Sequence, residues 1–268
     1  MTSDLPRITA IVRTRDSFPR VEDTIRSLRM QTDVFLRIIV VDSGSIPSEV
    51  DRLRDLADLL IDISGQPFNY SRAINVALPN VDTDLVLVIS SHVRIEDAGV
   101  LSSLCGLMRP DTAAAYICAD PKATYFSVEK IDRNNFTGSN GLYNQFALIP
   151  RRLLEEQKFR EDVFSCEDQV WAVWALHQKS MHTLRVAASL VHVDNPHGNL
   201  FKWLNEEVAL AYFVDRSRLS IHRIGALVIH GLWLWSQGRE RVGKNQIILA
   251  MRLLKAKFIK PVYQSKYF

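Results

Sequence analysis

Residues 36–45 read LRIIVVDSGS, an almost continuous apolar run that stops abruptly at polar turn residues. Such a run is typical of a strand that is buried on both faces of a sheet. Residues 8–12, 59–63 and 85–89 have the same character. A buried helix is the alternative, but these runs are short and turn residues follow them, which favours strands.

Helical periodicity alternates with these runs, at residues 21–30 and 71–77, which predicts βαβ units and a mainly parallel sheet flanked by helices. We also expect helices at residues 151–157 and 167–177 and a strand-like stretch at residues 183–193. Beyond residue 199 the pattern is helical, at 201–215, 220–236 and 245–259. We therefore predict an α/β domain over residues 1–198 and a helical C-terminal extension over residues 199–268.

The composition is that of an ordinary globular protein. Of 268 residues, 47% are apolar and 24% charged, and 33 Lys and Arg against 30 Asp and Glu leave a net charge of +3. These values exclude disordered, collagen-like and coiled-coil chains. Three cysteines without a CxxC pair predict neither a disulfide framework nor a thiolate zinc site. The N-terminus MTSDLPR lacks a signal pattern and no run of about 18 apolar residues occurs, so a cytoplasmic location is expected.

Polar residues follow three of the predicted strands, at 13–16 (RTRD), 42–45 (DSGS) and 90–92 (SSH). Parallel strands end at one edge of their sheet, where α/β proteins bind ligands. Each segment alone is ordinary turn chemistry, but the three together predict a site for a polar ligand. The GxGxxG, GxxxxGK[ST], GxSxG and HExxH patterns are absent, which argues against several nucleotide, hydrolase and zinc-protease sites.

Five segments resemble a known family in content and order: ITAIVRTRDSF with VEDTIRSLRMQT, LRIIVVDSGS, FNYSRAINVAL, DLVLVISSHV and FSCEDQVWAVWAL. They are similar to family 2 glycosyltransferases, which have the GT-A fold, over about residues 8–197. The resemblance implies an inverting, nucleotide-sugar-dependent transferase.

The resemblance implies that the donor sugar nucleotide contacts residues on several segments. Asp42 would accept a hydrogen bond from the base, although a turn or cap role is its alternative. Arg72 would lie near the base or the diphosphate, although a solvated helix face is the alternative. The implied donor-binding set is Thr14, Arg15, Asp42, Arg72, Ser91, His92 and Asn144.

The metal motif departs from the family pattern, because Ser90-Ser91-His92 replaces the usual D-x-D. The resemblance implies a divalent metal, Mn²⁺ or Mg²⁺, with His92 in the place of the last Asp. Imidazole suits Mn²⁺ or a later transition metal better than Mg²⁺. His192 matches a second ligand, and His197 is the alternative. The other interpretation is that His92 contacts ribose or phosphate without a metal.

Glu167 and Asp168 open a predicted helix, where the helix dipole favours negative charge. The resemblance implies that Asp168 is the general base that deprotonates the acceptor hydroxyl, with Glu167 as second choice; helix capping is the alternative. Trp171 and Trp174, three residues apart, either stack on a sugar or belong to the core.

The C-terminal part combines Trp233 and Trp235 with a strongly basic end. This pattern suits peripheral contact with an anionic membrane surface and a lipid-linked acceptor. Packing on the catalytic domain or a homodimer is the alternative, and no nucleic-acid motif is present.

The sequence therefore predicts transfer of a hexose-type sugar to a glycan or lipid-linked glycan, as in polysaccharide or cell-envelope biosynthesis, with the enzyme in the cytoplasm or at the cytoplasmic face of the membrane. The missing D-x-D keeps a non-catalytic glycan- or partner-binding module open. A nucleotidyltransferase is disfavoured, because no Gly-rich loop follows the first strand.

Overall fold

The computed structural model describes residues 5–119, 127–189, 191–193 and 200–262, which form two compact units. Residues 5–119, 127–161, 167–189 and 191–193 form the first unit, and residues 162–166 and 200–262 form the second. The boundary predicted near residue 198 lies outside the described residues.

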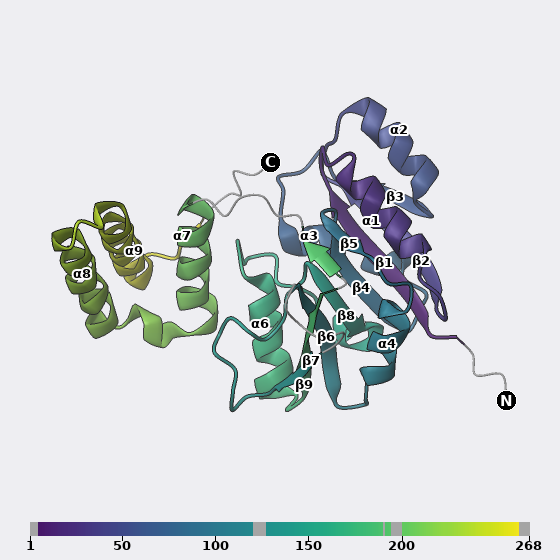
Figure 1. The fold of residues 1–268 in the computed structure, drawn as a ribbon. Helices are drawn as coiled ribbons and strands as arrows, with labels where there is room; N and C mark the ends of the chain where they lie inside the picture. Colours follow the sequence, from purple (N-terminus) through teal and green to yellow (C-terminus); the bar gives the residue numbers. More distant parts are fainter. Residues whose placement is uncertain (1–4, 120–126, 190, 194–199, 263–268) are drawn as a thin grey trace. The chain divides into compact units, whose positions relative to one another are not determined.

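The first unit is built on an eight-stranded sheet in the order β3-β2-β1-β4-β8-β6-β9-β7 (Figure 1). Its strands are β1 (Arg7–Thr14), β2 (Phe35–Asp42), β3 (Leu59–Asp62), β4 (Leu85–Ser90), β6 (Thr112–Ala119), β7 (Ser127–Ile131), β8 (Phe146–Pro150) and β9 (His182–Ala188). Strands β1 to β4 are parallel, β8 is antiparallel to β4 and β6, and β7 is antiparallel to β9. The four apolar runs are thus confirmed as strands, and the α/β sheet with mainly parallel strands is confirmed as well.

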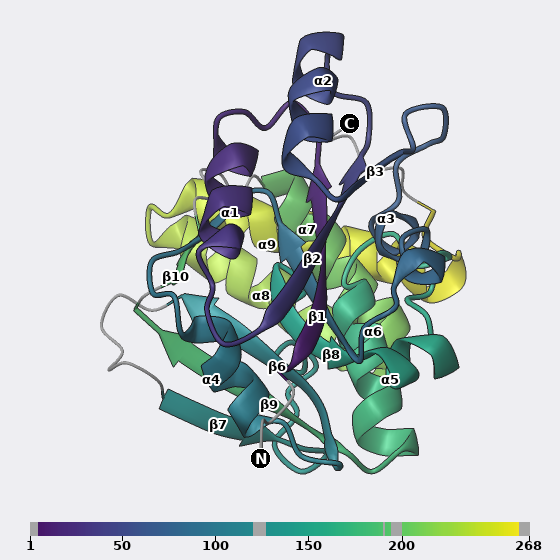
Figure 2. The same ribbon diagram turned by 90° about the vertical axis from the view of Figure 1, so that its right-hand side faces the viewer.

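Helices cover both faces of this sheet (Figure 2). One layer contains α1 (Arg20–Arg29), α2 (Pro47–Leu56) and α4 (Val100–Leu107), and the other contains α3 (Tyr70–Asn75), the short helix η1 (Leu78–Asn80), α5 (Arg151–Glu156) and α6 (Glu167–Val173). Successive side chains of β2 alternate between the layers: Ile38 and Val40 pack with the first, and Ile39 and Val41 with the second. This alternation explains why the strand is apolar at consecutive positions.

Two predicted elements are interrupted. The stretch 183–193 consists of β9 and a separate strand, β10 (Val191–Val193), which pairs antiparallel with β5 (Val93–Ile95) in a second sheet. The helix predicted over 167–177 is α6 followed by a π-helical turn, η2 (Trp174–Gln178).

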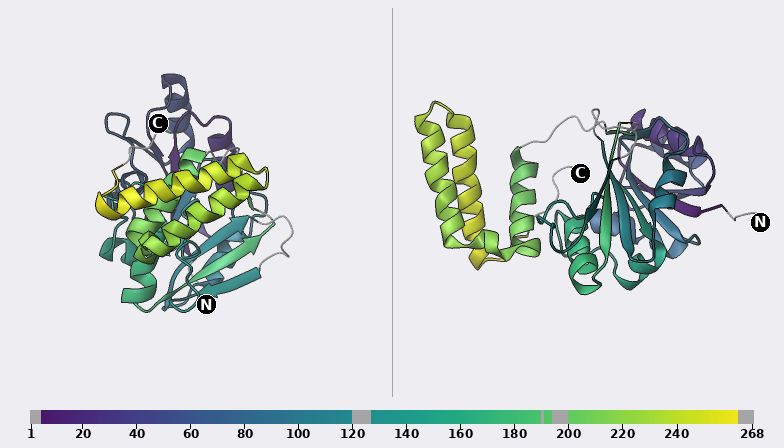
Figure 3. Two further views of the ribbon diagram at one scale, coloured as in Figure 1. Left: turned by 90° about the vertical axis from the view of Figure 1, so that its left-hand side faces the viewer. Right: turned by 60° about the horizontal axis from the view of Figure 1, so that its bottom comes forward.

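The second unit contains helices α7 (Leu200–Ala209), η3 (Leu210–Val214), η4 (Arg216–Leu219), α8 (Ile221–Ser236) and α9 (Glu240–Phe258). Helices α8 and α9 form an antiparallel hairpin, and α7 packs beside α9 (Figure 3). The hairpin helices touch at two glycines, because a Cβ built on Gly231 would lie 2.8 Å from the carbonyl oxygen of Gly243. Among the described residues, no helix has both the length and the apolar character needed to cross a bilayer.

Candidate functional site

The three polar segments predicted to meet do converge at one edge of the sheet. Thr14 at the end of β1 pairs in register with Asp42 at the end of β2, and Arg13 pairs with Ser90 at the end of β4. The edge thus collects side chains from three parallel strands, as expected for a ligand site of an α/β fold.

Asp42 makes the contacts of a turn residue. Its nearly completely buried carboxylate accepts hydrogen bonds from the backbone N–H groups of Gly44 (3.1 Å) and Ser45 (3.0 Å). Gly44 has a φ of 108°, a conformation that favours glycine. Beside this turn, the buried Thr14 hydroxyl has no hydrogen-bond partner among the described residues, so it can bond a ligand.

A buried arginine, Arg13, lies at the centre of the edge. Its guanidinium donates to Ser90 Oγ (3.2 Å) and to the Asn144 carbonyl oxygen (3.0 Å), and lies 4.0 Å from Glu167 Oε1. Burial lowers the pKa of Arg13, while the charge of Glu167 acts in the opposite direction. Both side chains of this ion pair are less than a tenth exposed. Arg13 therefore brings a fixed positive charge next to the carboxylates of α6.

Asp168 is held by backbone groups on two sides. The N–H of Asn144 donates to its Oδ2 (3.3 Å) and the N–H of Gln169 to its Oδ1 (2.8 Å). The side chain of Asn144 also donates to Glu167 Oε1 (2.5 Å). Burial and the neighbouring Glu167 charge raise the pKa of Asp168 to about 7, against the opposing effect of these hydrogen bonds and of Arg13. A carboxyl group that titrates near neutral pH can act as a general base or acid.

The loop that carries Asn144 is clamped onto α6. Gln169 accepts a hydrogen bond from the N–H of Gly141 (2.9 Å) and donates to the carbonyl oxygen of Leu142. A Cβ on Gly141 would lie 2.5 Å from Ala172 Cβ, so only glycine allows this close approach. The clamp fixes the position of Asn144 relative to Asp168.

Of the histidines of the predicted metal site, His192 lies on β10 and His92 in the turn directly before the paired strand β5. His192 lies opposite Arg94 of β5, and its Nε2 pairs with Glu96 Oε1 (3.1 Å). His197 lies outside the described residues. No group of three or more His, Cys, Asp and Glu side chains suited to hold a metal occurs in the described part of the chain.

Three further predicted residues have local partners. Arg72 on α3 pairs with Glu161 (3.1 Å) and Arg15 with Asp16 (3.7 Å). Ser91 is buried and donates to Ser17 Oγ (3.1 Å). Of the predicted set, the structure therefore gathers Asn144, Glu167 and Asp168 into one hydrogen-bonded cluster.

Trp171 is a core residue rather than an exposed stacking surface. It is 2% exposed, and its indole N–H donates to the Gln157 carbonyl oxygen (2.8 Å). Trp174 packs against it with ring centroids 5.5 Å apart.

Sequence reasoning did not single out Arg13 or Gln169. The signal for Arg13 was a cation that directly continues the apolar strand run, because a charge there needs a buried partner. For Gln169 no signal was available, since its partners Gly141 and Leu142 come from a distant loop.

Comparisons with known proteins define the class. The profile of Glycosyl transferase family 2 matches residues 9–178. The chain therefore belongs to glycosyl transferase family 2, and the resemblance seen in the sequence is confirmed. No curated protein sequence matches the chain significantly.

Solved structures share the GT-A fold with this chain. Mannosyltransferase PcManGT from Pyrobaculum calidifontis, in complex with GDP-Man and Mn²⁺, is 17% identical, with a TM-score of 0.64 over 97% of this chain and 89% of that chain. TarS 1-349 from S. aureus, in complex with UDP-GlcNAc, is 16% identical, with a TM-score of 0.57 over 94% and 91%. Glucosyl-3-phosphoglycerate synthase from Mycobacterium tuberculosis is 13% identical, with a TM-score of 0.55 over 78% and 77%.

Proposed function

We propose that this glycosyltransferase transfers a hexose-type sugar from a nucleoside diphosphate sugar to an acceptor hydroxyl, with inversion at the anomeric carbon. The observation that carries the proposal is the cluster of Arg13, Asn144, Glu167 and Asp168 at the carboxyl edge of the sheet. Structures with the same fold bind GDP-Man and UDP-GlcNAc, which supports the donor class.

Asp168 is the proposed general base. Its carboxylate takes the proton of the acceptor hydroxyl, whose oxygen forms a bond to the anomeric carbon while the bond from that carbon to the diphosphate oxygen breaks. A pKa of about 7 leaves a substantial fraction of Asp168 ionised at neutral pH and still basic enough to accept the proton. Glu167, which is paired with Arg13, is the second choice for the base.

Donor binding is assigned to the carboxyl edge. The buried hydroxyl of Thr14 and the carboxylate of Asp42 lie side by side in the strand register and would hold the nucleoside. Arg15, Arg72, Ser91, His92 and Asn144 complete the proposed donor-binding set.

A divalent metal is part of the proposal. His92 would hold it, with His192 as second ligand, and imidazole ligands suit Mn²⁺ better than Mg²⁺. The metal would neutralise charge on the leaving diphosphate. Two structures with the same fold contain Mn²⁺, which supports testing that ion first.

The proposed acceptor is a glycan or a lipid-linked glycan of polysaccharide or cell-envelope synthesis. We place the enzyme in the cytoplasm or at the cytoplasmic face of the membrane, with residues 1–198 as the catalytic domain. The extension 199–268 would contact a membrane surface or a second copy of the chain.

The test is calorimetric titration with UDP, dTDP, GDP and CMP, each with Mn²⁺, with Mg²⁺ and with EDTA. We expect one nucleotide to bind selectively, and the product made from the matching sugar nucleotide to have inverted anomeric configuration. His92→Ala should abolish the dependence of binding on Mn²⁺, whereas His230→Ala, in the second unit, should not. Absence of binding to every nucleotide would reject the transferase and favour a non-catalytic binding module.

A further inference from the structure

The positive charge of this protein is concentrated in the α8–α9 hairpin. Residues 221–262 contain eight Lys and Arg and a single acidic residue, Glu240, whereas the rest of the chain contains 25 Lys and Arg against 29 Asp and Glu. The net charge is therefore +7 in the hairpin segment and −4 elsewhere. Such a separation of sign favours a polyanionic partner for the hairpin.

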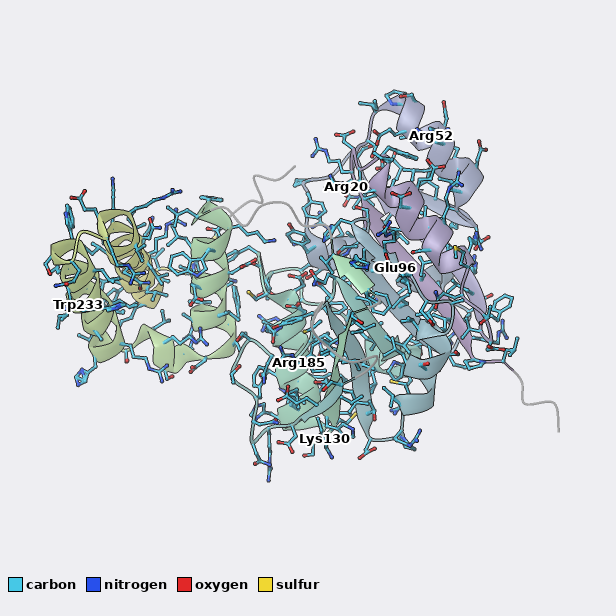
Figure 4. The ribbon with its side chains drawn as sticks, in the orientation of Figure 1. Arg20, Arg52, Glu96, Lys130, Arg185 and Trp233 are labelled. Atoms are coloured by element: carbon cyan, nitrogen blue, oxygen red, sulfur yellow. The ribbon has the colours of Figure 1, made fainter. Side chains whose placement is uncertain are left out.

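The end of the hairpin where α8 meets α9, residues 232–244, combines this charge with large exposed apolar side chains. Leu232, Trp233 and Trp235 are 54%, 55% and 48% exposed, and Val242 is 39% exposed. Figure 4 shows Trp233 projecting from α8 away from α9. We call this end the hairpin tip.

The cations of the hairpin tip are exposed as well. Arg239, Arg241 and Lys244 form no ion pair with any residue that the structure describes. Lys260, at the opposite end of the hairpin, does pair, with Asp162 (3.8 Å). The tip therefore presents apolar and cationic side chains together, without acidic partners within the unit.

The two helices of the hairpin are in close contact at its tip. Gly231 and Gly243 lie in backbone contact where the tip joins the rest of the hairpin, so neither can carry a larger side chain without separating the helices. This contact restrains the backbone of the tip before binding, which reduces the conformational entropy that binding costs.

We propose that the hairpin tip docks on an anionic lipid surface, with Trp233 and Trp235 in the interfacial layer and Arg239, Arg241 and Lys244 against the headgroups. Tryptophan prefers the boundary between headgroups and acyl chains, because its ring is apolar while its N–H needs a polar partner. Lys and Arg beside it bind anionic headgroups. A second copy of this chain fits less well, since two tips would bring the same positive charges together. The inference rests on the proposed function only in that a membrane surface would carry the lipid-linked acceptor.

The test is sedimentation of the full-length protein with vesicles of phosphatidylcholine containing phosphatidylglycerol, and with vesicles of pure phosphatidylcholine. We expect binding to the anionic vesicles that salt weakens. The triple variant R239Q/R241Q/K244Q should bind roughly 100-fold more weakly, because each basic residue near an anionic surface contributes roughly fivefold. Its matched control, R109Q/R133Q/K158Q, removes three positive charges from the first unit instead. It should bind the vesicles as the wild type does.

The apolar contribution is tested with W233S/W235S, which should lower binding on the order of tenfold or more. The control M30S removes a residue that is 61% exposed in the first unit, and it should have no effect. Circular dichroism and nucleotide titration of each variant separate a folding defect, or a failure of the proposed transferase, from loss of lipid binding. Equal binding to neutral vesicles, an unaffected triple variant, or a wild-type dimer that W233S/W235S converts to monomers would overturn the proposal.

Discussion

The carboxyl group of Asp168 should make the folded protein less stable as the pH rises, and Asp168→Asn should remove this effect. In the unfolded chain an aspartate has a pKa of 3.8, whereas in the structure burial and Glu167 raise it to about 7. As the pH rises from 4 to about 7, the unfolded chain therefore releases this proton before the folded protein does. In this window the unfolded chain binds fewer protons than the folded protein does. The free energy of unfolding therefore falls as the pH rises.

The magnitude follows from the two pKa values. A difference of one between the pKa values of the folded and unfolded states corresponds to about 1.4 kcal/mol. The ionised carboxylate therefore destabilises the folded state by up to about 4 kcal/mol at alkaline pH. Asp168→Asn keeps the shape and carries no charge. Its stability gain over the wild type should grow by about 2.5 kcal/mol between about pH 5 and about pH 8.

Urea unfolding at these two pH values measures the difference. Asp55→Asn, a change at an exposed position of α2, is the matched control and should shift stability by less than about 0.5 kcal/mol at both. The same Asp168→Asn protein should lose roughly 100-fold to 10,000-fold of transferase activity. A stability difference that does not change with pH would refute the raised pKa, and full activity would refute the role of Asp168 as base.

Two other substitutions probe the surroundings of this base. Arg13→Met leaves the buried Glu167 carboxylate without its cation and should lower the free energy of unfolding by about 3–5 kcal/mol, measured in urea; it should also move the acidic limb of the pH–rate profile upward. A loss below about 1 kcal/mol would mean that the pair is not formed. Gly141→Ala should cost about 1–3 kcal/mol in a thermal melt, because its Cβ collides with Ala172, whereas Gly106→Ala has open space and should cost nothing. Equal melting temperatures for the two alanine variants would contradict the clamp on α6.

Much of the parallel half of the sheet is evident from the sequence. Strands β1, β2 and β4 are buried on both faces, so each is apolar at consecutive positions and ends in polar residues. Helix α2 is not evident from the sequence, because only Leu53 of its ten residues is buried. Strand β6 is not evident either, since the three alanines of TAAAYICA favour a helix and so mask the strand.

The candidate site, like the fold, is predicted from the sequence only in part. The motifs that carry the family resemblance are evident without any geometry, and they indicate Asp42, Asn144, Glu167 and Asp168 as candidates. For Asp42 the local sequence also indicates the position, since a polar residue that ends an apolar strand lies at the edge of the sheet.

Tertiary structure decides what those groups can do. The pKa of Asp168 depends on how much water reaches it and on the charges of Glu167 and Arg13, and Arg13 comes from a strand more than 150 residues earlier in the chain. Likewise, the Asp42 carboxylate accepts hydrogen bonds from N–H groups of its own turn, while the neighbouring Thr14 hydroxyl has no partner among the described residues. Burial and through-space charge vary over a few ångströms, whereas sequence separation does not measure distance, so these properties appear only once the chain is folded.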